Sequence, residues 1–437
     1  MQDTLEVRDW RGRLYQVGPA APQLIGRPRS AMLWPAMAAM AAVGPMQYGY
    51  AALAPSIARA HGTSAAEVLL PLAVWLTCQA AVALPATRLL SRGVVGVRVA
   101  LWLGALLCAL AIPSLAAPGV PLLVGYGLLG GTGAGLVYAA CTETLARWYP
   151  ERPGVRVAFV TGAYSCSALP LMLDLRLWPV MAGFGLAAIA WAAAVLRTPP
   201  ANWWPPEIDP REWALDRRVL HRQPRAARQF SLGEAARTPT LVVLTVILIG
   251  AGAVAIFDVI ALAFLGPEPP WAALAVLLAL TGASRSAAVP LAERFGRVKV
   301  LALALALLTI AQGMLAGAAA VAAADTVALA AAIPAGLGGG AIYPLIAALV
   351  REYFGEDRVH GIHGLVYTAK AVAGPAGVGL AILALPALAT NTGAPVFVAA
   401  MILAAATALL CATLRRPGVP ATLPAPPPGA VKVGRLM

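Results

Sequence analysis

Two cationic side chains lie in sequence segments that are otherwise apolar. Lys370 is in HGLVYTAKAVAGPAGVGLAILAL, and Arg285 is in LAVLLALTGASRSAAVPL. A cation at the centre of a bilayer costs roughly 2.5–3.5 kcal/mol on insertion scales, so each is expected to meet a partner of opposite charge. An arginine can bind a carboxylate through two parallel hydrogen bonds, while a lysine supplies a compact point charge. The pair predicts a site for a small carboxylate, with a dianion bound better than a monoanion.

Two acidic residues in apolar segments leave other interpretations open. Asp258 lies in AGAVAIFDVIALAF. If Asp258 reaches a buried cation, it would neutralise that cation while no anion is bound. It would accept a proton when an anion binds, which favours proton-coupled transport. Glu143 precedes Arg147 by one helical turn, so an i,i+4 ion pair is expected there. Buried ion pairs between these acids and the two cations are the purely structural alternative.

The composition indicates a membrane protein with many spans. Hydrophobic residues make up 60% of the chain and charged residues 12%, a balance typical of polytopic membrane proteins. A span needs about 20 apolar residues. Twelve windows fit: 31–58, 66–90, 94–116, 120–147, 155–174, 176–197, 238–265, 271–291, 299–320, 326–350, 360–384 and 394–414.

A polar segment divides these windows six and six. The predicted division is a cytoplasmic N-terminal segment 1–30, a six-helix bundle 31–197, a cytoplasmic connector 198–237, a second bundle 238–414 and a cytoplasmic tail 415–437. The predicted fold class is an all-α membrane protein.

The net charge of +13 is explained by the orientation of the chain in the membrane. With both termini inside, all but four of the 32 Lys and Arg fall on cytoplasmic segments; Arg59 and Arg176 fall outside, and Arg285 and Lys370 fall within the membrane. This asymmetry follows the positive-inside rule, so no nucleic-acid partner is predicted. The preference for Arg over Lys and the richness in Ala and Gly suggest a GC-rich bacterium, so the expected location is the bacterial plasma (inner) membrane.

No catalytic or cofactor motif accompanies these spans. The five cysteines stand singly in apolar segments, and the four histidines form no metal-ligand spacing. No nucleophile–base arrangement or pair of catalytic carboxylates is evident. We therefore predict no metal, no cofactor and no enzymatic activity.

The two halves repeat each other. GTGAGLVY ends at Tyr138 and GLGGGAIY ends at Tyr343, 205 positions later, and Pro85 corresponds to Pro290 at the same offset. Parallel six-helix repeats with a site at their interface near mid-membrane describe the major facilitator arrangement. Glycines recur every four residues in both segments, which predicts helix faces in close contact.

Five stretches resemble the oxalate/formate antiporter (OFA) family of the major facilitator superfamily, across nearly the whole chain. They are MQYGYAALAPSI, GGTGAGLVYAACTETLARWYPERPG, LRTPPANWWPPEIDP, GLGGGAIYPLIAALVREYFGED and HGLVYTAKAVAGPAG. The resemblance implies exchange of oxalate-like and formate-like anions. It implies that Arg285 and Lys370 bind the dicarboxylate in a cavity lined by aromatic residues, which match Tyr48, Tyr138, Tyr164, Tyr343 and Tyr367.

The chain departs from that family at several positions. Its eighth window reads Thr-Gly-Ala-Ser-Arg up to Arg285, where the family has Asn-Gly-x-Gly-Arg. The loop after the second window, TRLLSRGVVG, lacks the acid of the family's Asp-Arg-x-Gly. Glu143 and Asp258 occupy positions expected to be uncharged. These differences bear on the substrate more than on the fold.

The expected function is secondary active antiport of small carboxylate anions across a lipid bilayer by alternating access. Proton-coupled transport of a monocarboxylate or a larger organic acid through Asp258 is the main alternative. A transport-inactive carboxylate sensor on the same scaffold is a lesser one.

Overall fold

A computed structural model describes residues 5–9, 13–224, 226–265, 272–320, 324–355, 359–389 and 393–418. Helices dominate, and eleven of the described helical stretches are long and apolar enough to cross a membrane. They correspond to eleven of the twelve predicted windows. The predicted window 31–58 is helical over 33–61 but is not one of the eleven, because its prolines and Gln47 lower its mean hydropathy. The predicted all-α membrane fold is therefore confirmed, with one small sheet added.

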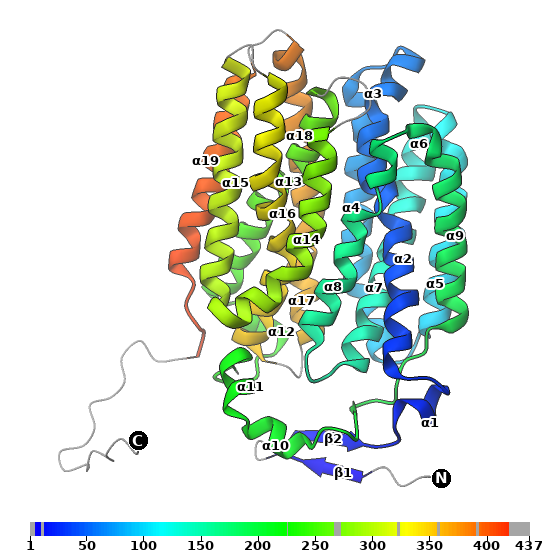
Figure 1. Ribbon diagram of the computed structural model, residues 1–437, viewed down its shortest axis with the longest axis vertical. Coiled ribbons are helices and arrows are strands. Elements are labelled where there is room, and N and C mark those ends of the chain that lie inside the picture. Colours follow the sequence, from blue (N-terminus) through cyan, green and yellow to red (C-terminus); the bar gives the residue numbers. More distant parts are fainter. Residues whose placement is uncertain are drawn as a thin grey trace, which may run out of the picture.

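The helices fall into two groups that lie side by side (Figure 1). The first group is α2 (Leu33–Gly44), η2 (Pro45–Gly49), α3 (Tyr50–His61), α4 (Ala65–Ser91), α5 (Val97–Ala111), η3 (Ile112–Ala116), α6 (Val120–Leu122), η4 (Leu123–Gly130), α7 (Gly131–Trp148), α8 (Pro153–Cys166), η5 (Leu169–Met172), η6 (Leu175–Leu177) and α9 (Trp178–Val195). The second is α13 (Pro239–Leu265), α14 (Ala272–Phe295), α15 (Arg297–Ala320), α16 (Ala324–Phe354), α17 (Val359–Tyr367), α18 (Lys370–Ala389), α19 (Ala394–Leu410) and η7 (Cys411–Thr413).

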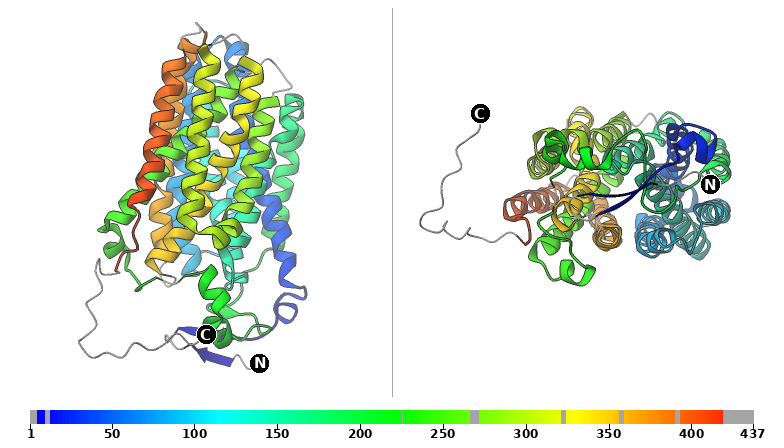
Figure 2. Two further views of the ribbon diagram at one scale, coloured as in Figure 1. Left: turned by 60° about the vertical axis from the view of Figure 1, so that its left-hand side comes forward. Right: turned by 90° about the horizontal axis from the view of Figure 1, so that it is seen from below.

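A small sheet lies at one end of the bundle, which we call the hairpin end (Figure 1). Its elements, with the short helices beside it, are β1 (Leu5–Arg8), β2 (Leu14–Val17), α1 (Ala21–Ile25), η1 (Arg29–Met32), β3 (Trp203–Trp204), α10 (Pro210–Leu215), α11 (Arg217–Arg222) and α12 (Leu232–Ala236). Strand β1 pairs antiparallel with β2, and β2 pairs parallel with β3. Seen from below in Figure 2, the strands run across this end.

The sheet joins two segments that the sequence analysis treated separately, the N-terminal segment and the connector. The Gln16 amide N–H donates to the Asn202 carbonyl (2.9 Å). The ring of Tyr15 packs edge-on against Trp204, with centroids 4.9 Å apart. Burial is the main cause that raises the pKa of Tyr15 above its ordinary value. These contacts attach the hairpin to the connector, a structure that the sequence analysis did not predict.

Glycine faces bring helices into close contact, as predicted. A Cβ at Gly131 of α7 would lie 2.5 Å from the carbonyl oxygen of Trp75 on α4, and one at Gly135 would lie 2.7 Å from that of Gln79. These carbonyls are four residues apart, as the glycines are, so α7 follows α4 turn by turn. The contact positions the Gln79 side chain beside the centre of the bundle.

The second half repeats this contact between α16 and α14. A Cβ at Gly336 would lie 2.6 Å from the carbonyl oxygen of Leu277, and Gly340 is packed as closely against Thr281. Arg285 follows Thr281 by one helical turn on α14. Close approach of the two helices thus fixes the position from which the Arg285 side chain extends.

The predicted window 360–384 is interrupted, which corrects the expectation that Lys370 lies within an unbroken helix. Helix α17 ends at Tyr367 and α18 begins at Lys370. Pro375 has no N–H, so the carbonyl of Ala371, four residues earlier, lacks a helical partner. The hydroxyl of Thr77 on α4 donates to this carbonyl (3.3 Å). Lys370 is the first residue of α18. It lies next to Ala371, whose carbonyl contacts Thr77 of the first half.

Candidate functional site

A small chamber of about 30 Å³ lies between the two halves. Both predicted cations and all five predicted tyrosines line it, together with Asp258. Its polar and charged lining residues are Gln47, Tyr48, Tyr138, Tyr164, Asp258, Thr281, Arg285, Tyr343, Tyr367 and Lys370. Side chains from α14, α16, α17 and α18 thus meet side chains from η2, α7 and α8. The structure brings the predicted site residues together, while their roles in binding stay a prediction.

Arg285 extends from α14 and is 7% exposed. Its guanidinium carbon lies 5.5 Å from the centroid of the Tyr343 ring, within the range of a cation–π interaction. Its Nε has no hydrogen-bond partner among the described residues. No described carboxylate forms an ion pair with it. A buried guanidinium with an unused donor is suited to an anionic ligand.

Lys370 is 6% exposed and meets aromatic rings and an amide. Its Nζ lies 5.8 Å from the ring centroid of Tyr343 and 5.9 Å from that of Tyr367. The Nζ donates a hydrogen bond to Oε1 of Gln79 on α4. The amide is neutral, so it solvates the ammonium and leaves its charge uncompensated.

Gln79 belongs to a chain of polar side chains that crosses the first half. Its Nε2 donates to the Tyr164 hydroxyl (3.0 Å), and that hydroxyl donates to Oε1 of Gln47 (2.7 Å). All three side chains are buried. Gln79 and Gln47 were not predicted as site residues, although an amide inside an apolar window is a signal that could have identified them.

The rings of the five tyrosines form two groups in contact, one of three rings and one of two. The rings of Tyr138 and Tyr367 stack with centroids 5.4 Å apart, and Tyr343 lies 6.1 Å from Tyr367. Tyr48 meets Tyr164 edge-on at 5.7 Å. The Tyr343 hydroxyl is buried and has no hydrogen-bond partner in the described part of the chain. It is a second unused polar group at the chamber, beside Arg285.

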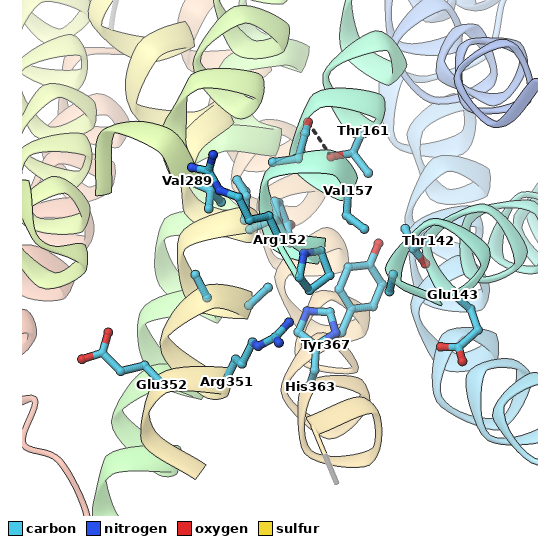
Figure 3. A pocket seen from close by; sticks show the side chains of 18 of the residues that line it. Thr142, Glu143, Arg152, Val157, Thr161, Val289, Arg351, Glu352, His363 and Tyr367 are labelled. Atoms are coloured by element: carbon cyan, nitrogen blue, oxygen red, sulfur yellow. Dashed lines mark hydrogen bonds between the residues drawn. The ribbon is translucent and has the colours of Figure 1, made fainter. Parts of the chain in front are cut away.

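A larger cavity of about 260 Å³ lies beside the chamber and extends to the hairpin end. Arg285, Tyr138, Tyr343 and Tyr367 line both spaces. Toward the hairpin end its lining includes Arg152, Glu293, Arg13 and Gln223. Figure 3 shows His363 close to Tyr367, with Glu143 and Glu352 at opposite sides of the view. The shared residues place the chamber and the cavity next to each other, and Arg285 lines both.

The two acidic residues pair with groups other than the buried cations. Glu143 accepts from Nε of Arg147 (2.9 Å), the predicted i,i+4 ion pair. Asp258 accepts a hydrogen bond from Gln312 on α15. Within the described ranges neither acid forms an ion pair with Arg285 or Lys370. The structural alternative, in which buried acids neutralise the two cations, is therefore wrong for this conformation.

Ion pairs at the hairpin end connect elements around the mouth of the cavity. Arg152, just before α8, pairs with Glu293 of α14, which links the two halves. Arg297 and Arg416 both pair with Glu352 within the second half. Glu293 and Glu352, which line the cavity, thus already have cationic partners.

No family model matches the chain. A protein of Thermoproteus tenax, described as an uncharacterized 38 kDa protein in the 23S RNA operon, is 30% identical over 341 residues, which cover 76% of this chain and 82% of that protein.

Solved structures with the same fold are more distant in sequence. The human organic anion transporter MFSD10 (TETRAN) has a TM-score of 0.58 at 14% identity. A variant of the E. coli fucose:proton symporter FucP has a TM-score of 0.56 at 15% identity. A structure of FucP in the outward conformation has a TM-score of 0.57, also at 15% identity. Each match covers 88% of this chain and 98% of the other. The chain has the fold of major facilitator transporters, and it belongs to the same family as the uncharacterized 38 kDa protein of Thermoproteus tenax.

Proposed function

We propose that this chain is a secondary transporter that exchanges small carboxylates, of the oxalate and formate kind, by alternating access. One observation carries the proposal: Arg285 and Lys370 are buried and line one chamber between the halves, and no described carboxylate is ion-paired with either. Two desolvated cations without a counter-charge favour an anion with two negative ends. One structural neighbour is named an organic anion transporter, which agrees with this substrate class.

The two cations differ in what they offer a dicarboxylate. Arg285 presents a planar group with an unused Nε donor, suited to one carboxylate in a bidentate mode. Lys370 would exchange its hydrogen bond to the neutral Gln79 for a bond to the second carboxylate. The Tyr343 hydroxyl is a further donor at the chamber. A monoanion has one carboxylate for the two cationic side chains and would bind less tightly than a dicarboxylate.

Exchange follows from the charge of the site. An empty carrier has an excess of positive charge in the chamber and faces a high barrier to closing around it, because desolvating an unpaired charge is costly. A bound dianion brings the site close to neutrality and lowers that barrier. The carrier would then reorient readily only when loaded, which gives obligate exchange. In this proposal the hairpin end faces the cytoplasm of a bacterium and the two six-helix halves rock about the chamber.

The primary test is counterflow of labelled oxalate into proteoliposomes preloaded with oxalate or formate, or left empty. We expect rapid uptake into preloaded vesicles and little uptake into empty ones. Comparable uptake into empty vesicles would exclude obligate exchange, and uptake driven by an imposed pH gradient alone would favour proton-coupled import. Specific oxalate binding without counterflow would identify a sensor.

Substitution of the cations tests the site itself. Lys370→Ala removes one end of the clamp, and losing one partner of a buried charge pair costs about 2–5 kcal/mol. We therefore expect oxalate affinity to fall by at least about 30-fold, at about 1.4 kcal/mol per tenfold. Lys299→Ala is the matched control, because Lys299 is exposed at the start of α15. Equal affinities in the two variants would remove Lys370 from the site.

A further inference from the structure

A buried carboxyl–amide pair lies at the chamber and has no role in the anion clamp proposed above. Asp258 on α13 is 1% exposed and lines the chamber, and Gln312 on α15 is fully buried. The Nε2 of Gln312 donates to Oδ1 of Asp258. Asp258 is an acid within a long apolar helix, so its placement requires a physical explanation.

Each of the two groups has one oxygen that the structure leaves unused. Oδ2 of Asp258 and Oε1 of Gln312 are buried and have no hydrogen-bond partner where the chain is described. An ionised carboxylate can only accept hydrogen bonds, and so can an amide oxygen. An ionised Asp258 would therefore be a buried charge with a single hydrogen bond, and it would leave the Gln312 oxygen unsatisfied.

One proton on Asp258 removes both defects. A carboxylic acid has one O–H donor, which can pair with Oε1 of Gln312 while the Nε2 hydrogen bond to the other carboxyl oxygen is kept. The two planar groups then form a reciprocal pair with two hydrogen bonds. We propose that Asp258 and Gln312 form a proton-binding site, and that Asp258 carries one proton together with the transported dianion. The coupling part rests on the proposed exchange function.

The charges around the chamber link proton binding to anion binding. The titratable and charged side chains that share the chamber with Asp258 are Tyr48, Tyr138, Tyr164, Arg285, Tyr343, Tyr367 and Lys370. Of the elements packed against α13, α19 carries no charged residue, and the charged residues of α3 (Arg59 and His61) lie at its exposed end. By its negative charge, a dianion bound in the same chamber disfavours an ionised Asp258 and so favours its protonated form. Proton and dianion therefore promote each other's binding.

The charge balance of exchange follows directly. A dianion with a protonated Asp258, or a monoanion with an ionised Asp258, each neutralise the two cations. One transported dianion plus one proton carries a net charge of −1, as does the monoanion that returns. The proton is taken up on the side where the dianion binds and is released where the dianion leaves. Exchange of a dianion for a monoanion would then move no net charge.

The protonation of Asp258 can be measured without transport. Infrared difference spectra of the purified protein at pH 7 with saturating oxalate, wild type minus Asp258→Asn, should show the carbonyl band of a protonated carboxyl group. Gln312→Leu should shift this band, because it removes both hydrogen bonds. Asp174→Asn is the matched control, since Asp174 is exposed near the start of α9. Absence of the band in wild type would overturn the proton site.

Coupling is tested in proteoliposomes loaded with formate and an internal pH indicator, with labelled oxalate added outside. Protein-free vesicles with the same loading correct for leakage of formic acid. We expect one proton to enter per oxalate. In Asp258→Asn the protons moved per oxalate should fall to background, and exchange should become sensitive to an imposed membrane potential.

The two measurements separate the two proposals. Oxalate–formate exchange without proton entry in wild type would overturn the coupling and leave the exchange function standing. The carboxyl band without any oxalate exchange would overturn the proposed substrate and leave the proton site standing.

Discussion

At the scale of single residues, neutral amides determine how the buried charges behave. Lys370 donates to Gln79, and Asp258 accepts from Gln312, so each ionisable group meets an amide where a counter-charge was an alternative. An amide satisfies hydrogen bonds but does not cancel charge. In the proposals above, the cations therefore stay available to an anion and Asp258 takes up a proton. Both proposals depend on the neutral amide that meets each ionisable side chain, Gln79 for Lys370 and Gln312 for Asp258.

Gln79 gives a prediction at this scale. In Gln79→Glu the new carboxylate would pair with Lys370 and compete with the substrate, so we expect oxalate affinity to fall at least about tenfold while the apparent melting temperature holds or rises. Gln79→Leu would leave the buried ammonium without this hydrogen bond, at a cost of about 1–3 kcal/mol, so the melting temperature should fall. Isothermal titration with oxalate and thermal unfolding in detergent measure both effects. Equal melting temperatures for the two variants would contradict the prediction.

At the scale of elements, glycines and prolines set where helices touch and where they break. Glycines every four residues on α7 and α16 let these helices approach the backbones of α4 and α14. Pro375 frees the carbonyl of Ala371, which then accepts from Thr77 across the boundary between the halves. The same residues therefore determine helix packing and the position at which Lys370 enters the chamber.

Gly131 tests the close approach of α7 and α4. A Cβ there would lie 2.5 Å from the Trp75 carbonyl oxygen, a backbone atom that cannot rotate away. We expect Gly131→Ala to destabilise the protein by about 1–3 kcal/mol, the usual effect of overpacking. Gly183→Ala on α9 is the matched control, because a Cβ at Gly183 meets nothing within 4 Å. Thermal unfolding in detergent should separate the two variants, and equal stabilities would contradict the close contact.

At the scale of the whole molecule, the chamber exists because two sets of helices meet. Gly162 of α8 and Gly282 of α14 pack backbone against backbone; a Cβ on either would lie 2.7 Å from the carbonyl oxygen of the other. Closer to the hairpin end the halves are joined by the ion pair between Arg152 and Glu293. In the proposed transport cycle such contacts change when the halves rock, and they would then set the balance between conformations.

The ion pair between Arg152 and Glu293 tests this balance. Because the Arg152 side chain is 44% exposed, the pair should contribute about 0.2–1 kcal/mol. We expect Arg152→Glu or Glu293→Arg alone to change the counterflow rate by up to about fivefold, and the double exchange to restore it. Exchanging the exposed pair Arg228 and Glu234 within the connector is the control. Failure of the double variant to recover would show that the residues act separately.

The sequence alone determined the membrane fold, most of the spans, and the charged and tyrosine residues of the chamber. The length of a hydrophobic window reflects the thickness of the bilayer, because each helix must cross the hydrocarbon core. It must also satisfy its backbone hydrogen bonds internally, so each window predicts a helix. The offset between the halves placed Tyr138 and Tyr343 in equivalent positions, and both line the chamber. The isolated cations Arg285 and Lys370 stood out because charge is rare in such windows. These signals are local, so one chain suffices to detect them.

Only the tertiary structure decided which groups pair. Asp258 could have met a cation on another helix, but it meets Gln312, and Lys370 meets Gln79. The pairing of the N-terminal hairpin with Trp203 and Trp204 was equally invisible in the sequence. Helix rotation and the crossing of distant segments set these contacts. Successive residues of a helix point in directions about 100° apart. Hydropathy does not fix how each helix is rotated, so it cannot tell which side chains face each other.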